Sequence, residues 1–238
     1  MKLDVLVMAA HPDDAELGCS GTIVKLTSQG KKVGIVDFTR GELGSRGTPE
    51  QRDVEAARSS EIMGLSARVN MGFRDGFFKN DEEHKLALIQ QIRRYQPDVI
   101  IANAPTDRHS DHGRASSLAK EAWFLSGLIK IETSFEGKAQ EPWRPTRIIY
   151  YIQDYLIMPD IVVDISDYYE TKVKAIKAFE SQFFNPEYDG PSTYISSNDY
   201  WHFLEARARD VGHLVGATYG VGFLSDIPVK IDTPLGLV

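Results

Sequence analysis

Two short polar segments carry the residues whose chemistry stands out in this chain. Residues 11–16 read HPDDAE and residues 107–112 read DRHSDH. Both segments combine imidazole with carboxylate, which is the ligand set of a catalytic zinc ion that keeps one position for water. Carboxylates this crowded repel one another unless a cation or a proton stabilises them. We therefore expect a metal site, with His11, Asp14 and His112 as its ligands.

The elements around these segments should bring them together. An apolar run from Leu3 to Ala10 predicts a buried strand directly before the first segment, and residues Asp98 to Asn103 predict another before the second. A helical pattern follows each segment. Because ligands of open α/β sheets bind at the carboxyl ends of the parallel strands, we expect both segments to face one crevice.

Short apolar runs alternate with segments of helical period along most of the chain. This pattern is typical of an α/β fold, here a Rossmann-like three-layer sandwich with a mostly parallel sheet and helices on both faces. Residues 147–153 and 160–165 predict two later strands that extend the sheet or form a hairpin-like pair. We find no linker or internal repeat, so residues 1–238 are expected to form a single domain.

Composition excludes several classes of function. A formal net charge of -7 over 238 residues, without any cluster of Lys and Arg, argues against nucleic acid as a partner. No apolar stretch is long enough to span a membrane or to act as a signal peptide, so we expect no membrane partner and a cytoplasmic protein. The single cysteine, Cys19, excludes an internal disulfide and is expected to be a small buried apolar residue. Gly18 and Gly21 lie in a turn rich in carboxylates, which would repel a bound dinucleotide.

The two polar segments resemble those of a known family. His-Pro-Asp-Asp-x-Glu after the first strand, with His-x-Asp-His after the fourth, is similar to the zinc-dependent N-acetylglucosaminyl deacetylases of the PIG-L/LmbE-like superfamily. Residues 11–21 and 39–48 look most like the branch that acts in bacillithiol biosynthesis. The resemblance implies a hydrolase that removes the N-acetyl group of N-acetylglucosaminyl malate and releases acetate. It also implies a homo-oligomer.

The resemblance also implies roles for individual residues. His11, Asp14 and His112 match the ligands of the family's zinc, although the same donors would accept ferrous iron. Asp13 matches the general base, which takes a proton from the attacking water. His109 matches a cationic stabiliser or proton donor, and Asp111 matches the carboxylate that orients it. Arg52 aligns with an arginine that contacts the sugar.

Other residues are candidates for substrate binding because of their place in the chain. Arg108 flanks the second polar segment, and its guanidinium could bind carboxylates of a malate group. Tyr194 lies in the Pro- and Gly-rich loop 185–197, where it could donate a hydrogen bond to an oxyanion. That loop is either a lid over the site or a plain surface connection. Glu16 is either a partner of the site or a carboxylate stabilised by the helix N-terminus.

Two alternatives to the malate deacetylase remain open. The same chemistry could act on another N-acetylated sugar such as a chitooligosaccharide. The chain could instead be a non-catalytic sugar-binding module that contains a structural metal. Asp13 distinguishes the last alternative, because a binding module would not need a second carboxylate beside the ligand Asp14. The apolar residues between Val221 and Leu237 could pack on another subunit or on the chain's own core.

Overall fold

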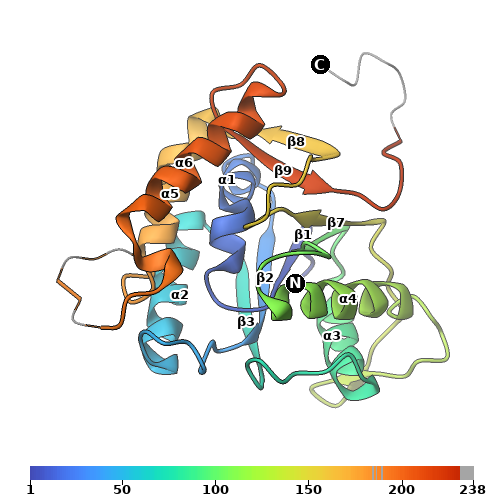
Figure 1. Cartoon of the computed structure of the whole chain (residues 1–238). Helices are drawn as coiled ribbons and strands as arrows, with labels where there is room; N and C mark the ends of the chain where they lie inside the picture. Colours follow the sequence, from blue (N-terminus) through green and yellow to red (C-terminus); the bar gives the residue numbers. More distant parts are fainter. Residues whose placement is uncertain (184, 186, 189, 231–238) are drawn as a thin grey trace.

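A mixed sheet of seven strands forms the centre of the protein (Figure 1). The structure is a computed structural model that describes residues 1–183, 185, 187, 188 and 190–230. In spatial order the strands are β3 (Ala67–Phe73), β2 (Val33–Thr39), β1 (Val5–Ala9), β4 (Val99–Asn103), β7 (Arg147–Tyr151), β9 (Gly220–Leu224) and β8 (Ile161–Asp164). The first five are parallel, whereas β9 runs antiparallel to both of its neighbours. A separate two-stranded sheet pairs β5 (Ser134–Phe135) with β6 (Lys138–Ala139).

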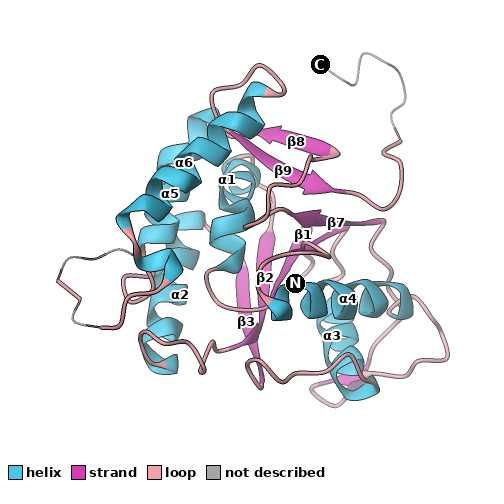
Figure 2. Ribbon diagram, viewed as in Figure 1, coloured by secondary structure: helices cyan, strands magenta, loops and turns pink. Residues whose placement is uncertain are grey.

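Helices cover both faces of the large sheet, which makes the three layers clear in Figure 2. One face carries α1 (Asp14–Ser28), α2 (Pro49–Met63), α5 (Tyr169–Lys177) and α6 (Asn198–His213). The other face carries α3 (Glu82–Tyr95) and α4 (Ser110–Leu125). The fold class expected from the sequence is thus confirmed. Among the described residues, no helix is both long and apolar enough to cross a membrane.

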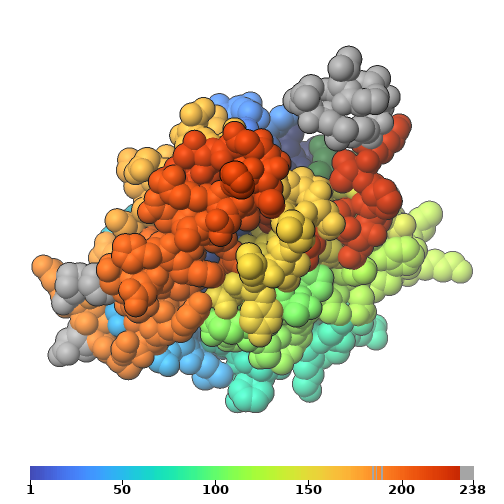
Figure 3. Space-filling view, turned by 45° about the horizontal axis from the view of Figure 1, so that its top comes forward, coloured from blue at the N-terminus to red at the C-terminus, as the bar shows by residue number. Residues whose placement is uncertain are grey.

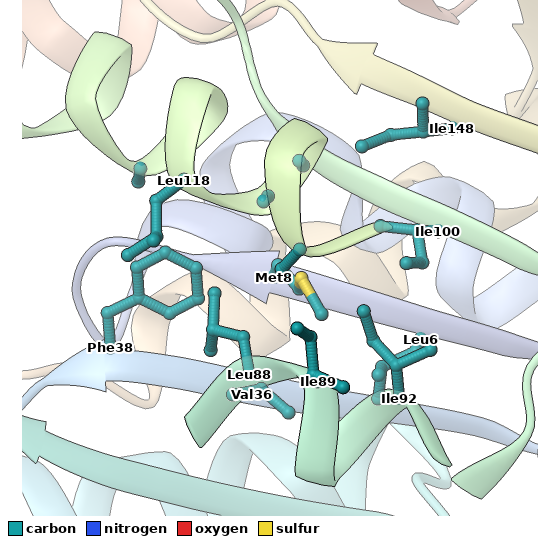
Figure 4. Close-up of a cluster of buried hydrophobic side chains, with 14 of the residues drawn as sticks. Leu6, Met8, Val36, Phe38, Leu88, Ile89, Ile92, Ile100, Leu118 and Ile148 are labelled. Carbon is teal, nitrogen blue, oxygen red and sulfur yellow. The ribbon is translucent and has the colours of Figure 1, made fainter. Parts of the chain in front are cut away.

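The core explains why the central strands are apolar along their whole length. Side chains alternate between the two faces of a strand, so Leu6 and Met8 of β1 pack toward α3 and α4 (Figure 4). Val5 and Val7 of the same strand pack toward α1 on the opposite face. Because helices bury both faces, neither set of positions can be polar.

The later part of the sheet differs from its sequence-based prediction in one respect. Strands β7 and β8 do extend the sheet, but they do not pair as a hairpin, because β9 lies between them. Val221 and Phe223 are buried in β9, so this part of the C-terminal apolar run packs on the chain's own core. Leu235 and Leu237 lie outside the described residues.

Helix boundaries follow local capping chemistry. Thr48 and Gln51 form a capping box at the start of α2, and Ser197 caps α6 by accepting a hydrogen bond from the backbone N–H of Tyr200. The predicted helix from residue 174 to 183 instead begins at Tyr169, after a short 3-10 turn, and ends at Lys177. Helix α1 packs very closely on β7. A side chain at Gly18 would collide with the Tyr151 ring, so only glycine fits there.

Candidate active site

A cavity of about 230 Å³ lies beyond the carboxyl ends of β1 and β4. The first polar segment contributes His11, Asp13 and Asp14 to its lining, and the second contributes His109 and His112. The expectation that the two segments share one crevice is therefore confirmed. The cavity also has an apolar side, formed by residues from α1, the 41–44 loop and the start of α6: Leu17, Leu43, Ile195 and Tyr200.

The Asp14 carboxylate lies between two imidazoles. Its Oδ2 is 3.3 Å from Nδ1 of His11, and its Oδ1 is 3.1 Å from Nε2 of His112. Burial alone would raise the pKa of Asp14, but the charge of His112 and hydrogen bonds with both imidazoles hold that pKa well below its usual range. The carboxylate is thus ionised, as a metal ligand must be.

Neighbouring side chains fix the orientation of these three groups. Nδ1 of His112 lies 2.7 Å from Oδ2 of Asp107, which leaves Nε2 facing Asp14. Asp14 accepts hydrogen bonds from Gln153 Nε2 at 2.8 Å and from the His11 backbone N–H at 3.0 Å. A histidine ligand held by a carboxylate through its other nitrogen is typical of zinc sites. The donor set and its supports therefore fit a divalent metal.

The other nitrogen of His11 faces a second group of carboxylates. Its Nε2 lies 3.1 Å from Asp75 Oδ1 and 3.4 Å from Asp111 Oδ2. These three residues also place ligand atoms close enough together to hold a cation, as do His11, His109 and His112. Since Asp75 and Asp111 both face Nε2, they orient the ring so that Nδ1 points toward Asp14.

Asp13 sits in a strained and secluded position. Its φ of 113° lies in the left-handed region, which side chains other than glycine seldom adopt and which is often found at functional sites. Among the described residues its carboxylate has no hydrogen bond, and the nearest cation is Nη2 of Arg52 at 3.9 Å. Burial raises the pKa of Asp13 to about 7, although the Arg52 charge opposes that shift. This carboxylate is suited to exchange a proton near neutral pH.

The structure places His109 at the cavity but gives Asp111 a different contact from the one expected. The backbone N–H of Asp111 donates to Nδ1 of His109 at 3.2 Å, so the proton of a neutral His109 ring lies on Nε2. The Asp111 carboxylate instead accepts from the Gly76 N–H at 2.8 Å and pairs with Arg114. Burial lowers the pKa of His109, and the charges of His11 and His112 lower it further. Asp111 therefore orients His109 through its backbone.

The three residues expected to bind substrate lie in different settings. Arg52 is buried, donates to Pro12 O at 3.3 Å and to Gln182, and lines the cavity beside Asp13. Arg108 also lines the cavity, pairs with Asp154 at 3.1 Å, and covers the Tyr194 ring. Tyr194 is half exposed at the rim, and the cavity lining next to it comes from Ile195 and Tyr200.

The 185–197 loop contacts the 41–48 loop next to the cavity. The backbone N–H of Gly47 donates to the Tyr188 hydroxyl at 2.9 Å, and Arg46 Nη1 donates to Pro191 O at 3.0 Å. Residues 186 and 189 of this loop lie outside the described residues. Whether the loop acts as a lid therefore stays a prediction.

Sequence reasoning missed several residues of the site. Asp75, Gln153, Asp107 and Tyr200 all support or line it, yet none was assigned a role. Asp75 and Gln153 follow the ends of β3 and β7, so the rule that placed the two polar segments could have found them as well. Asp107 lies five residues before His112 in a segment already singled out. Tyr200 gives no such signal, because it reaches the site only through the packing of α6.

Glu16 has a structural partner rather than a place in the cavity. Its carboxylate is fully buried and pairs with Arg68 at 2.7 Å, and Arg68 also pairs with Asp37 of β2 at 2.7 Å. Ser59 of α2 donates to the same Glu16 oxygen at 2.9 Å. This network connects α1 to α2, β2 and β3 directly behind the metal ligands.

Comparison with known proteins agrees with this geometry. Residues 6–123 match the family model described as PIG-L, GlcNAc-PI de-N-acetylase. The chain is 30% identical over 232 residues to the diacetylchitobiose deacetylase of Thermococcus kodakarensis, covering 92% of this chain and 81% of that protein. This chain belongs to the PIG-L family of deacetylases. Members of this family are amide hydrolases, and the candidate site contains the His and Asp residues needed to bind a metal.

Other PIG-L relatives differ in the substrate that their names give. A probable N-acetyl-alpha-D-glucosaminyl L-malate deacetylase 2 of Bacillus cereus is 29% identical, covering 76% of this chain and 84% of that protein. A crystal structure of a conserved protein from Thermus thermophilus is 39% identical with a TM-score of 0.85, and the match covers 98% of each chain. The similarity thus supports an N-deacetylase of substrates that contain N-acetylglucosamine.

Proposed function

We propose that this protein removes the N-acetyl group from an N-acetylglucosamine unit attached to a neutral sugar, with zinc or ferrous iron bound by His11, Asp14 and His112. The observation that carries the proposal is the pair Asp13 and Asp14. One carboxylate lies between two imidazoles, whereas its neighbour in the chain has no hydrogen bond among the described residues and faces the same cavity. A metal ligand beside a free base is the arrangement that amide hydrolysis requires.

The bound metal would supply Lewis acidity, which polarises the acetamide carbonyl and lowers the pKa of water. Asp13 accepts the proton of the attacking water, because its carboxylate is unbonded and buried next to the ligand set. His109 carries its ring proton on Nε2 and donates it toward the oxyanion or the departing amine. Arg52 lies beside Asp13 and stabilises its ionised form.

The charges at the cavity favour a neutral partner sugar. Each arginine that lines the cavity already has polar partners, with Arg108 on Asp154 and Arg52 on Pro12 and Gln182. Asp75 and Asp154 add negative charge to the same lining. A malate group would bring further carboxylates into this setting. The apolar side with Leu17 and Tyr200 instead suits the face of a sugar ring.

N-acetylglucosaminyl malate is the second candidate, and Arg108 is the observation that favours it. Its side chain is half exposed and stacks over Tyr194, so it could leave Asp154 and bind a malate carboxylate. The similarity to the Bacillus cereus protein supports this candidate as well.

A comparison of substrates tests the proposal. We expect kcat/KM for N,N'-diacetylchitobiose to exceed that for N-acetylglucosaminyl malate and for free N-acetylglucosamine. Arg108→Gln should leave the ranking unchanged, as should the control Arg58→Gln, which removes an exposed arginine on α2. A preference for the malate conjugate that Arg108→Gln abolishes and Arg58→Gln retains would establish the second candidate instead.

A further inference from the structure

A second, smaller cavity lies behind the active site. Its volume is about 30 Å³, and it is enclosed by α1, α5, α6, β9 and the segment 152–157. Most of its lining is apolar, and Leu17 of α1 lines both this cavity and the active site. In the space-filling view, α6 lies against the yellow segment that follows β7 (Figure 3). The exposed side chain of Leu156 lies at its outer edge.

A buried lysine points its ammonium group into this apolar setting. Lys172 of α5 is only 6% exposed, and its Nζ donates one hydrogen bond of 2.8 Å to the backbone oxygen of Leu17. An ammonium group has three N–H donors. Among the described residues no carboxylate pairs with Lys172, so at least two donors lack a protein partner.

A second cation lines the same cavity from the opposite helix. Nη2 of Arg207 donates to the backbone oxygens of Asp154 and Tyr155, but its Nη1 is buried without a hydrogen-bond partner. Asp154 does not neutralise this guanidinium by direct contact, since its carboxylate pairs with Arg108. Two cationic side chains with unused donors therefore face one small cavity.

This arrangement carries an electrostatic cost that a bound anion would relieve. Burial lowers the pKa of Lys172 to about 8, and the positive charge of Arg207 lowers it further, so the ammonium is still charged at neutral pH. The titratable groups that influence Lys172 are the Cys19 thiol of α1 and Arg207 of α6. Asp107 and Asp154 act on Arg207 from the side of the active site. Unpaired buried donors cost free energy as well.

We propose that this cavity binds a small monovalent anion, which accepts hydrogen bonds from Lys172 and from Nη1 of Arg207. The cavity volume is about that of two water-sized spheres, which suits chloride or a small carboxylate such as acetate and excludes a sugar. A bound anion would connect α5 and α6 to α1, the helix that begins with Asp14. The site does not depend on the reaction proposed above, although acetate is the product of that reaction.

Thermal stability of the metal-loaded protein tests the proposal. Chloride or acetate replaces gluconate at constant ionic strength and pH 7, because gluconate is too large for the cavity. We expect the Tm to rise by about 3 °C when the anion is at ten times its Kd. Lys172→Met should abolish this rise, whereas Lys174→Met, which removes an exposed lysine on the same helix, should retain it. The arm that responds identifies the anion, and the response should fade above pH 8.

The outcomes are distinct. No rise in Tm for the unmodified protein, or an equal rise in Lys172→Met, would overturn the proposal. If Lys172→Met does not fold, crystals of the unmodified protein grown in bromide supply the second measurement. An anomalous peak within hydrogen-bond distance of Lys172 Nζ supports the site, and a cavity without such a peak at saturating bromide overturns it.

Discussion

Asp107 and Nδ1 of His112 are 2.7 Å apart at the base of the active-site cavity. The contact fixes the His112 ring so that Nε2 faces Asp14 at 3.1 Å. We predict that Asp107→Ala weakens metal binding by about 10- to 100-fold, because the ring loses its fixed orientation and part of its basicity. Competition with a chromophoric chelator measures the effect. The control Asp199→Ala, an exposed position on α6, should bind metal normally, and equal affinity in both variants would contradict the prediction.

Asp13→Asn should separate catalysis from metal binding. The substitution keeps the size of the side chain but removes the base, so turnover should fall by about 100-fold or more. Metal content should be unchanged, because Asp14 and the two imidazoles remain. Elemental analysis together with initial rates checks both parts. Loss of metal in Asp13→Asn would show that Asp13 is itself a ligand.

The buried Asp13 also predicts how stability varies with pH in the metal-free protein. Its pKa is raised from 3.8 to about 7, so between these values the folded state holds a proton that the unfolded state has lost. Stability should therefore fall as pH rises from about 4 to about 7, by a few kcal/mol relative to Asp13→Asn. Denaturant unfolding of both proteins across this range measures the difference. Parallel curves would show that Asp13 ionises normally.

Cys19 should be inert in the folded protein. It is fully buried on α1, and burial raises the pKa of its thiol well above the usual range, which leaves almost no thiolate to react. We predict that iodoacetamide at pH 8 modifies Cys19 at the rate of global unfolding and rapidly once denaturant is added. Mass spectrometry follows the modification. Rapid labelling under native conditions would mean that α1 opens locally.

Much of the site could be predicted because it follows local rules. The apolar runs that became β1 and β4 are each followed directly by a polar segment, and parallel strands bring such segments to one edge. That reasoning was enough to place His11, Asp14 and His112 within a few ångströms of one another.

The parts that could not be predicted depend on contacts between distant segments. Strand β9 inserts between β7 and β8, which reflects a pairing across more than sixty residues that no local pattern encodes. Asp111 lies three residues before Arg114 on α4, yet its carboxylate also contacts His11 and Gly76 from other elements. Sequence spacing suggested His109 as its partner, but the helix directs the carboxylate elsewhere.

Acetate release from N,N'-diacetylchitobiose, measured before and after metal removal, tests the central claim most directly. The protein as purified should contain about one zinc or iron per chain and release acetate. Treatment with a chelator should abolish the release, and stoichiometric zinc or ferrous iron should restore it in the unmodified protein but not in His112→Ala. Release that continues at full rate without metal, or that His112→Ala retains, would contradict a metal-dependent deacetylase built on His11, Asp14 and His112.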